Sequence, residues 1–266
     1  IRRLKKLEER QELAAGKSIL VIPCINSYSM NIGKRFWSTD NTDINRMFPG
    51  YQEGETTQRV AAGVFDAVKD YGIGIQFASN YMSGRFLPHI RMMRTGFEDI
   101  EAAKNFAFPY VMVRDTRPFD TTTLNYNWQI WETKAYSVYT TDTEEIDRQS
   151  AADAVKGIEK MLNAEGVLNS RVSGGYHYHS QVLGDDSLLS VRCMEAGIYE
   201  NKVYVGEEVH EGQLLAEITD PYEGTVLEQL TAPADATVFF QHKAPLIYAV
   251  HKAPLIYADT TALKLG

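Results

Sequence analysis

Cysteine is scarce in this chain, which has only Cys24 and Cys193 among its 266 residues. Two cysteines so far apart provide neither a disulfide framework nor the spacing of metal ligands. The sequence also has no apolar run long enough to cross a bilayer, and it has no signal-peptide pattern. These features argue against a disulfide-rich secreted domain and a membrane-spanning protein, and they favour a cytoplasmic location.

Positive charge is also in short supply, because 27 Lys and Arg residues face 35 Asp and Glu residues and leave a net charge of −8. Such an acidic balance argues against a nucleic-acid-binding surface. The hydrophobic fraction of 44% and the charged fraction of 23% are ordinary for a globular protein. The chain is long enough for one large domain or two smaller ones, and we expect two.

The most informative stretch that the sequence does contain runs from Asp43 to Gly50 and reads Asp-Ile-Asn-Arg-Met-Phe-Pro-Gly. Arg46 can offer a planar pair of donors to a carboxylate, and Asn45 can add a directed amide hydrogen bond. Asp43 is placed to fix the rotamer of Arg46, and the Pro-Gly pair ends the element. The segment therefore predicts a carboxylate-binding site, with a surface salt bridge on a loop as the alternative.

The order of features around this segment resembles the succinylglutamate desuccinylase/aspartoacylase family, which belongs to the zinc carboxypeptidase-like hydrolases. An apolar run at Ser18–Pro23, expected to be a buried strand, precedes Asn26-Ser27-Tyr28 and Arg35, and a helix from about Thr57 to Tyr71 follows the segment. The resemblance covers nearly the whole chain. It implies an N-terminally truncated α/β domain, with a mixed sheet flanked by helices, over residues 1–168. From about Arg171 the sequence changes to short strands and turns, which predicts a smaller all-β domain of barrel or sandwich type over residues 169–266.

The resemblance also implies roles for individual residues. Leu124–Glu132 is expected to be a strand that ends in a carboxylate shortly before a long helix over residues 143–165. In the family, a glutamate at such a position activates a metal-bound water, which makes Glu132 the implied catalytic base. Arg35 would stabilise the carbonyl or oxyanion, and Asn45 with Arg46 would bind the carboxylate of the substrate. The alternative for Glu132 is an edge-strand glutamate in solvent.

The metal site implied by the resemblance is incomplete in this sequence. The strand that carries the third zinc-binding histidine of the family reads Gly74-Ile75-Gln76 here, and the amide of Gln76 is a poor zinc ligand. His89 is the nearest histidine, either as a ligand or as a hydrogen-bonded structural residue. The family's first two ligands, from a His-Gly-x-Glu motif, would fall before Ile1. The resemblance nevertheless makes zinc the expected cofactor, with an incomplete site in this chain.

Two further patterns remain open at the sequence level. His177 and His179 would share one face if they lay on a strand, and they are either a metal pair or surface or interface histidines. The peptide His-Lys-Ala-Pro-Leu-Ile-Tyr-Ala occurs at residues 242–249 and again at 251–258, as a duplicated strand or a sequence error. The segment around Gly206–Leu215 resembles the hairpin of biotinyl and lipoyl barrels, but it has no lysine at a hairpin tip that could carry a cofactor.

Two functions from different classes follow from these patterns. The first is a metal-dependent amide hydrolase, a deacylase of N-acyl amino acids or similar carboxylated substrates, with an incomplete metal site in this chain. The second is a non-catalytic relative that binds a carboxylated ligand. Both predict a small carboxylated partner, no nucleic-acid partner and no membrane partner, and both are compatible with a homo-oligomer.

Overall fold

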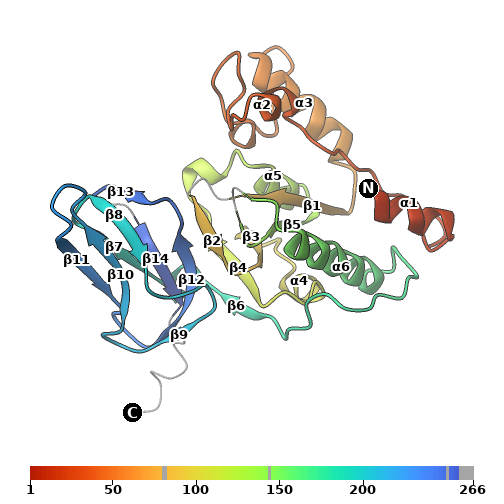
Figure 1. Cartoon of the computed structure of the whole chain (residues 1–266). Helices are drawn as coiled ribbons and strands as arrows, with labels where there is room; N and C mark the ends of the chain where they lie inside the picture. Colours follow the sequence, from red (N-terminus) through yellow and green to blue (C-terminus); the bar gives the residue numbers. More distant parts are fainter. Residues whose placement is uncertain (80–82, 143–144, 250–251, 258–266) are drawn as a thin grey trace. The chain divides into compact units, whose positions relative to one another are not determined.

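The computed structural model describes residues 1–79, 83–142, 145–249 and 252–257 (Figure 1). The chain divides into two compact units. The first comprises Ile1–Phe77, Ile90–Val138 and Asp153–Ser180, and the second comprises Ala78–His89, Tyr139–Ala152 and Gln181–Gly266. The boundary expected between residues 168 and 169 therefore lies within the first unit, and the second unit also includes two earlier segments.

The first unit is built on a sheet in which the strands lie in the order β1-β5-β3-β4. These strands are β1 (Ile73–Ala78), β5 (Lys134–Tyr139), β3 (His89–Arg94) and β4 (Tyr110–Asp115). The amide of Lys134 donates to Gly72 at 3.0 Å near the start of both β1 and β5. Further along, the Gln76 side chain donates to Ser137 Oγ at 2.8 Å. These two contacts show that β1 and β5 run in the same direction.

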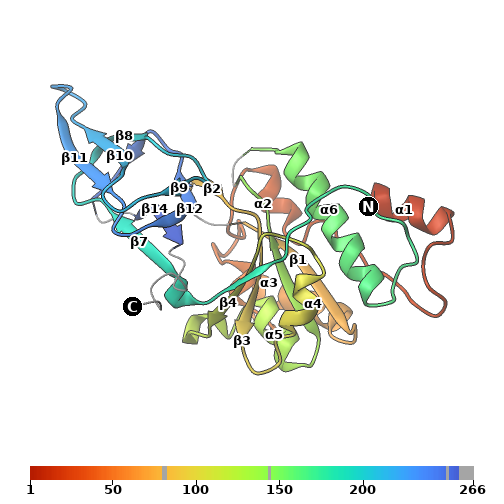
Figure 2. The same ribbon diagram turned by 90° about the horizontal axis from the view of Figure 1, so that it is seen from below.

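Helices cover both faces of this sheet because its strands are apolar on both sides. On one face, Tyr136 and Val138 of β5 pack with residues of α1 (Arg2–Glu9), α4 (Ile100–Lys104) and α6 (Arg148–Ala164). On the opposite face, Ala135 packs with residues of α3 (Thr56–Val68) and α5 (Leu124–Ile130). The alternation of Ala135 with Tyr136 follows the two-residue period of a strand. The predicted α/β sheet with helices is thus confirmed, and Figure 2 shows it from a second side.

Short elements connect these layers: α2 (Ser27–Asn31), η1 (Ile44–Arg46) and η2 (Pro118–Asp120). The strand expected at Ser18–Pro23 is wrong, because that segment has no regular secondary structure. Its four aliphatic side chains, from Ile19 to Ile22, are between 36% and 45% exposed. Among the described residues, no backbone hydrogen bond is made by residues 18–22, so this run lacks the ladder that a buried strand needs.

One strand prediction and one helix prediction also need correction. Residues 124–130 form α5 and not a strand, because Thr123 caps the amide of Tyr126 and the spacing of Leu124 and Trp128 buries both on one helical face. The long helix expected over residues 143–165 begins only at Arg148 and ends at Ala164. Ile146, expected on its inner face, lies before it and is 90% exposed.

The second unit consists mainly of antiparallel strands, as expected for the C-terminal part of the chain. One of its sheets has the order β11-β10-β8-β13, and the other has the order β2-β12-β14-β7 with β9 paired to β12. A short strand, β6 (Gln181–Leu183), and η3 (Asp185–Ser187) precede them. The strands of these sheets are β2 (Gly84–Phe86), β7 (Leu188–Arg192), β8 (Gly197–Asn201), β9 (Glu208–Val209), β10 (Leu214–Thr219), β11 (Val226–Thr231), β12 (Ala236–His242), β13 (Leu246–Ile247) and β14 (Lys252–Tyr257).

The duplicated peptide adopts two different structures. Its first copy contributes His242 to the end of β12 and Leu246–Ile247 to β13, which pairs with β8. Its second copy forms β14, which pairs with β12 and with β7, while residues 251 and 258 lie outside the described part. The same sequence thus pairs with different neighbours, so tertiary context decides the structure of this peptide.

Among the helices that the structure describes, none is long and apolar enough to cross a membrane.

Candidate functional site

The Asp43–Gly50 segment begins with a capped single turn. The carboxylate of Asp43 accepts a hydrogen bond from the amide of Asn45 at 3.0 Å and so caps η1. Its other oxygen accepts two hydrogen bonds from Arg35, at 3.2 Å from Nε and 2.9 Å from Nη2. Asp43 was expected to fix Arg46, but it orients Arg35 instead.

Arg46 is held by a different acid. Its Nη1 atom donates to the Phe119 carbonyl at 2.7 Å and to Asp120 Oδ1 at 3.2 Å. The guanidinium also lies 5.2 Å from the centre of the Phe119 ring. Within the described chain, no hydrogen bond involves Nε or Nη2 of Arg46, and the side chain is 38% exposed. One edge of the guanidinium is therefore fixed, and the other edge can bind a carboxylate.

Asn45 joins this site to helix α5. Its Oδ1 atom accepts a hydrogen bond from the amide of Leu124 at 3.2 Å, which satisfies a donor at the start of α5. Asn45 Nδ2 makes no hydrogen bond to any described residue, so it can donate to a ligand beside Arg46. We refer to Asn45 and Arg46 as the Asn-Arg pair.

The turn after the Asn-Arg pair is fixed by close packing between α3 and α5. Gly50 has a φ of 93°, and a Cβ atom on it would lie 2.1 Å from the backbone nitrogen of Ala62. On the other side, Asn127 donates to the Phe48 carbonyl at 3.1 Å. Only glycine fits at residue 50, which explains the Pro-Gly sequence that ends the segment.

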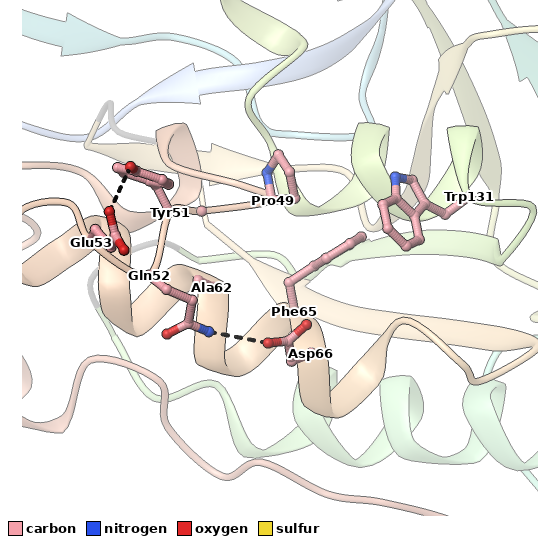
Figure 3. Close-up of a pocket in the computed structure, with 9 residues that line it drawn as sticks. Pro49, Tyr51, Gln52, Glu53, Ala62, Phe65, Asp66 and Trp131 are labelled. Carbon is pink, nitrogen blue, oxygen red and sulfur yellow. Dashed lines mark hydrogen bonds between the residues drawn. The ribbon is translucent and has the colours of Figure 1, made fainter.

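An open pocket of about 480 Å³ lies beside this turn (Figure 3). Trp131 packs edge-on against Phe65 at 5.1 Å between ring centres, and Tyr51 donates to Glu53 at 3.2 Å. Of the described residues that line this pocket, Pro49 and Gly50 belong to the predicted segment, but Asn45 and Arg46 are not among them. The residues that line it are Pro49, Gly50, Tyr51, Gln52, Glu53, Ala62, Phe65, Asp66 and Trp131.

Gln76 occupies the strand position at which the family resemblance implies a metal ligand. Its Nε2 atom donates to Ser137 Oγ, and Gly74, on the same face of β1, lies against the ring of Trp128. Gln76 therefore faces the side of the sheet that α3 and α5 cover. Its amide is part of a hydrogen bond between neighbouring strands and has no arrangement typical of a metal ligand.

The structural reason for choosing Glu132 does not hold. The strand that precedes the long helix α6 is β5, and it ends at Tyr139. Glu132 lies in the turn between α5 and β5, where its φ is 64° and its side chain is exposed. Because Gln76 pairs with Ser137, which lies further along β5, Glu132 is near the opposite end of that strand. The structure thus does not bring Glu132 to Gln76, and its catalytic role stays a prediction without structural support.

None of the histidines considered as metal ligands has the surroundings of a metal ligand within the described chain. His89 is 2% exposed, its Nδ1 atom is 2.8 Å from the Leu87 carbonyl, and its ring stacks on Tyr139 at 4.7 Å. His177 and His179 lie in a loop, so the strand arrangement that would place both on one face is absent here. A zinc site takes at least three protein ligands, and among the described residues no three His, Cys, Asp or Glu side chains converge. The donors in the described chain therefore do not fit zinc.

Sequence reasoning overlooked Asn125, which is only 1% exposed on α5. Neither polar atom of its amide, nor Trp128 Nε1 one turn later, has a hydrogen-bond partner in the described chain. Buried polar groups are almost always paired, so these atoms mark a place where a polar ligand or water is expected. The only sequence signal was the Asn-x-Asn pattern around Tyr126.

Comparisons with known proteins agree with this architecture. The chain matches no sequence profile of a known protein family. It is 24% identical over 235 residues to the N-alpha-acetyl-L-2,4-diaminobutyric acid deacetylase of Halomonas elongata. The aligned region covers 82% of this chain and 65% of the deacetylase. The chain thus spans less than two thirds of the length of that curated relative.

Solved structures give closer agreement in fold than in sequence. A succinylglutamate desuccinylase/aspartoacylase from Rhodobacter sphaeroides superimposes with a TM-score of 0.75 at 20% identity, over 90% of this chain and 74% of that one. The product-bound ectoine utilization protein EutE (DoeB) from Ruegeria pomeroyi gives a TM-score of 0.72 at 20% identity, over 89% and 73% of the two chains. The predicted resemblance is therefore confirmed: the chain has the fold of the succinylglutamate desuccinylase/aspartoacylase family, and it is a distant sequence relative of a deacetylase.

Proposed function

We propose that this chain binds a small carboxylated molecule of the N-acyl amino acid class through the Asn-Arg pair, and that its described residues do not hydrolyse it. The observation that carries the proposal is the arrangement of Arg46. Asp120 and Phe119 fix one edge of its guanidinium, and the other edge remains for a ligand. A guanidinium held in this way loses little rotamer freedom when it binds a carboxylate, which favours affinity.

The surroundings of Arg46 support recognition of a ligand that has an amide group as well as a carboxylate. Asn45 Nδ2 is a second donor beside it, and the buried amide of Asn125 follows the Leu124 amide that Asn45 binds. An N-acyl amino acid offers a carboxylate for the guanidinium and an amide group that can exchange hydrogen bonds with asparagine side chains. The structural relatives support the same class, since one is the succinylglutamate desuccinylase/aspartoacylase from Rhodobacter sphaeroides.

A second candidate is the deacylase itself, and the 24% identity to the Halomonas elongata deacetylase favours it. Hydrolysis of an amide needs a base and an electrophile at the scissile carbonyl. Gln76, whose amide is hydrogen-bonded to Ser137, does not provide an electrophile, and Glu132, the predicted base, lies elsewhere on the surface. The two residues therefore do not form one catalytic site. A deacylase would therefore depend on groups other than the described residues.

Calorimetry with N-alpha-acetyl-L-2,4-diaminobutyric acid tests the binding proposal. We expect saturable binding that Arg46→Gln weakens about tenfold or more, because one charge-assisted hydrogen-bond pair is lost. Arg46→Lys should recover only part of the affinity, since an ammonium lacks the planar pair of donors. Arg94→Gln is the matched control, because Arg94 is an exposed arginine of the same unit paired with Asp115.

The same samples decide between the two candidates. Release of acetate is measured with and without added zinc, and thermal unfolding confirms that each variant is folded. Binding without release of acetate supports the proposal. Zinc-dependent release that Arg46→Gln abolishes would replace it with the deacylase, and a failure of the wild-type protein to bind would reject both.

A further inference from the structure

A loop after helix α6 gathers basic groups that the Asn-Arg pair does not use. The segment Ser173-Gly174-Gly175-Tyr176-His177 runs back along the helix, where it meets Lys156 and Lys160, one helical turn apart. The segment after α6 can be followed in Figure 1. All of these residues belong to the first unit.

Lys160 is fixed by the loop. Its ammonium donates to the Tyr176 carbonyl and lies 3.3 Å from His177 Nδ1. Burial, together with the neighbouring charge of Lys156, lowers the pKa of Lys160, and Asp153 offsets part of this effect. In the part of the chain that the structure describes, no carboxylate lies within ion-pair distance of Lys160. A cation in this position gains from an external anion.

Lys156 lies directly across the two glycines. A Cβ atom on Gly174 would be 3.0 Å from Lys156 Nζ, and one on Gly175 would be 2.8 Å from Lys156 Cβ. Both glycines have positive φ angles, of 75° and 76°. Only glycine therefore permits this close approach, which brings the Gly174–Gly175 turn next to the Lys156 side chain, while Lys160 contacts the loop one residue further on, at Tyr176. Among the described residues, Lys156 has no hydrogen-bond or ion-pair partner.

The loop is held in place from both sides. The ring of Tyr176 packs against Phe108 at 4.8 Å, and the amide of Tyr178 donates to the Ala107 carbonyl at 3.1 Å. Ser180 donates to the Phe108 carbonyl at 2.7 Å. Because the loop is fixed before any ligand arrives, binding an anion costs little ordering of the chain.

We propose that Lys156, Lys160 and the Gly174–Gly175 turn form a second anion site, which binds the phosphoryl dianion of a small molecule. Two ammonium groups, together with the Gly174 and Gly175 amides, which make no backbone hydrogen bond in the described chain, match a dianion with several acceptor oxygens better than a monoanionic carboxylate. The site differs from the Asn-Arg pair in position and in ligand charge. It accounts for the Gly-Gly-Tyr-His segment, which the proposed function leaves unused.

Titration of the chain of residues 1–266 with inorganic phosphate at low ionic strength tests this proposal, with calorimetry and the amide NMR signals of Gly174 and Gly175 as readouts. We expect saturable binding that shifts both signals, and methyl phosphate should bind similarly. Lys156→Gln and Lys160→Gln should each weaken binding about tenfold, as expected for loss of one charge-assisted contact. Acetate should cause no saturable shift.

The controls separate this site from the rest of the surface. Lys104→Gln removes an exposed lysine of the same unit, which pairs with Glu101, and should leave phosphate binding unchanged. Arg46→Gln should also leave it unchanged, so failure here does not bear on the Asn-Arg pair. Lys156→Gln removes no hydrogen bond or ion pair within the described chain, so it remains informative if Lys160→Gln unfolds. Absence of saturable binding, equal binding of acetate, or wild-type affinity in Lys156→Gln would overturn the proposal.

Discussion

Single residues in the candidate site are constrained more by their neighbours than by their chemistry. Gly50 has a positive φ and lies against the backbone of Ala62, and the Pro-Gly sequence predicted a turn there without revealing this contact. The Asn-Arg-x-Phe-Pro-Gly segment predicts a ligand-binding arginine, and this stays a prediction; what the structure shows is that Asp120 and Phe119 hold one edge of Arg46. It could not predict which acid fixes that arginine, because Asp120 is distant in sequence and only folding brings it to Arg46.

Gly50→Ala should therefore lower the free energy of unfolding by at least about 2 kcal/mol, from the strain of its φ angle and the overlap with Ala62. Gly63→Ala is the opposite case, because Gly63 is exposed on α3 and a Cβ atom there would meet nothing within 4 Å. It should gain about 0.5–1 kcal/mol from helix propensity. Urea denaturation of both variants measures the difference, and similar values for the two would contradict this account.

Asp40 links the start of α3 to pH. Burial raises the pKa of Asp40, but hydrogen bonds from Thr57 and Thr42 together outweigh burial and leave the pKa below its ordinary value. A carboxyl with a depressed folded pKa stabilises the protein above its unfolded pKa, and this stability is lost as pH falls through the folded pKa. Unfolding free energy should thus fall below about pH 4 more steeply in the wild type than in Asp40→Asn. Parallel pH profiles would show that Asp40 does not contribute.

At the scale of elements, the pattern in the sequence located helices and strands well where periodicity and burial agreed. The helix at Thr56–Val68 and the strand at Ile73–Ala78 are examples. It failed at residues 124–132, where apolar and polar residues alternate by chance. There Thr123 and Asn45, from two different parts of the chain, cap a helix. The contact from Asn45 leaves no local signal, and the alternation over residues 124–132 favours a strand despite the N-cap residue Thr123 directly before it.

Thr123→Ala should show how strongly that cap determines α5. The Thr123 hydroxyl accepts from the Tyr126 amide at 3.3 Å and donates to the Asp120 carbonyl at 2.7 Å. Its loss should cost about 1–2 kcal/mol of unfolding free energy. Thr121→Ala removes an exposed hydroxyl that bonds only the Pro118 carbonyl and should change stability by less than about 0.5 kcal/mol. Chemical denaturation of the pair checks this, and equal losses would argue against the cap.

At the scale of the whole molecule, composition correctly indicated an α/β part and a β-rich part, but it could not place their boundary. The second unit includes Ala78–His89 and Tyr139–Ala152. Along the chain, segments of the first unit separate these two stretches from each other and from the rest of the second unit. A chain that passes between units more than once gives no single change in composition. The apolar run at Ile19–Ile22 shows the same limit, because its residue types fit a buried strand and its position in the structure is exposed.

This exposed run should affect the behaviour of the protein in solution. Four consecutive aliphatic side chains without backbone hydrogen bonds in the described chain are a surface that favours association. We expect light scattering to show concentration-dependent self-association, and Leu20→Lys should reduce it without lowering the melting temperature. Lys17→Arg, on the adjacent residue stretch, is the control that keeps the apolar run intact. Self-association that is unchanged in Leu20→Lys would show that another surface is responsible.

The central claim is that Arg46 binds the carboxylate of the ligand, and a double-mutant cycle between protein and ligand tests it most directly. The affinities of N-alpha-acetyl-L-2,4-diaminobutyric acid and of its carboxamide are measured with wild-type protein and with Arg46→Gln. We predict that the wild type prefers the acid about tenfold or more, as expected for a charge-assisted pair, and that Arg46→Gln loses this preference. An undiminished preference for the acid in Arg46→Gln, or equal affinities in the wild type, would contradict the account.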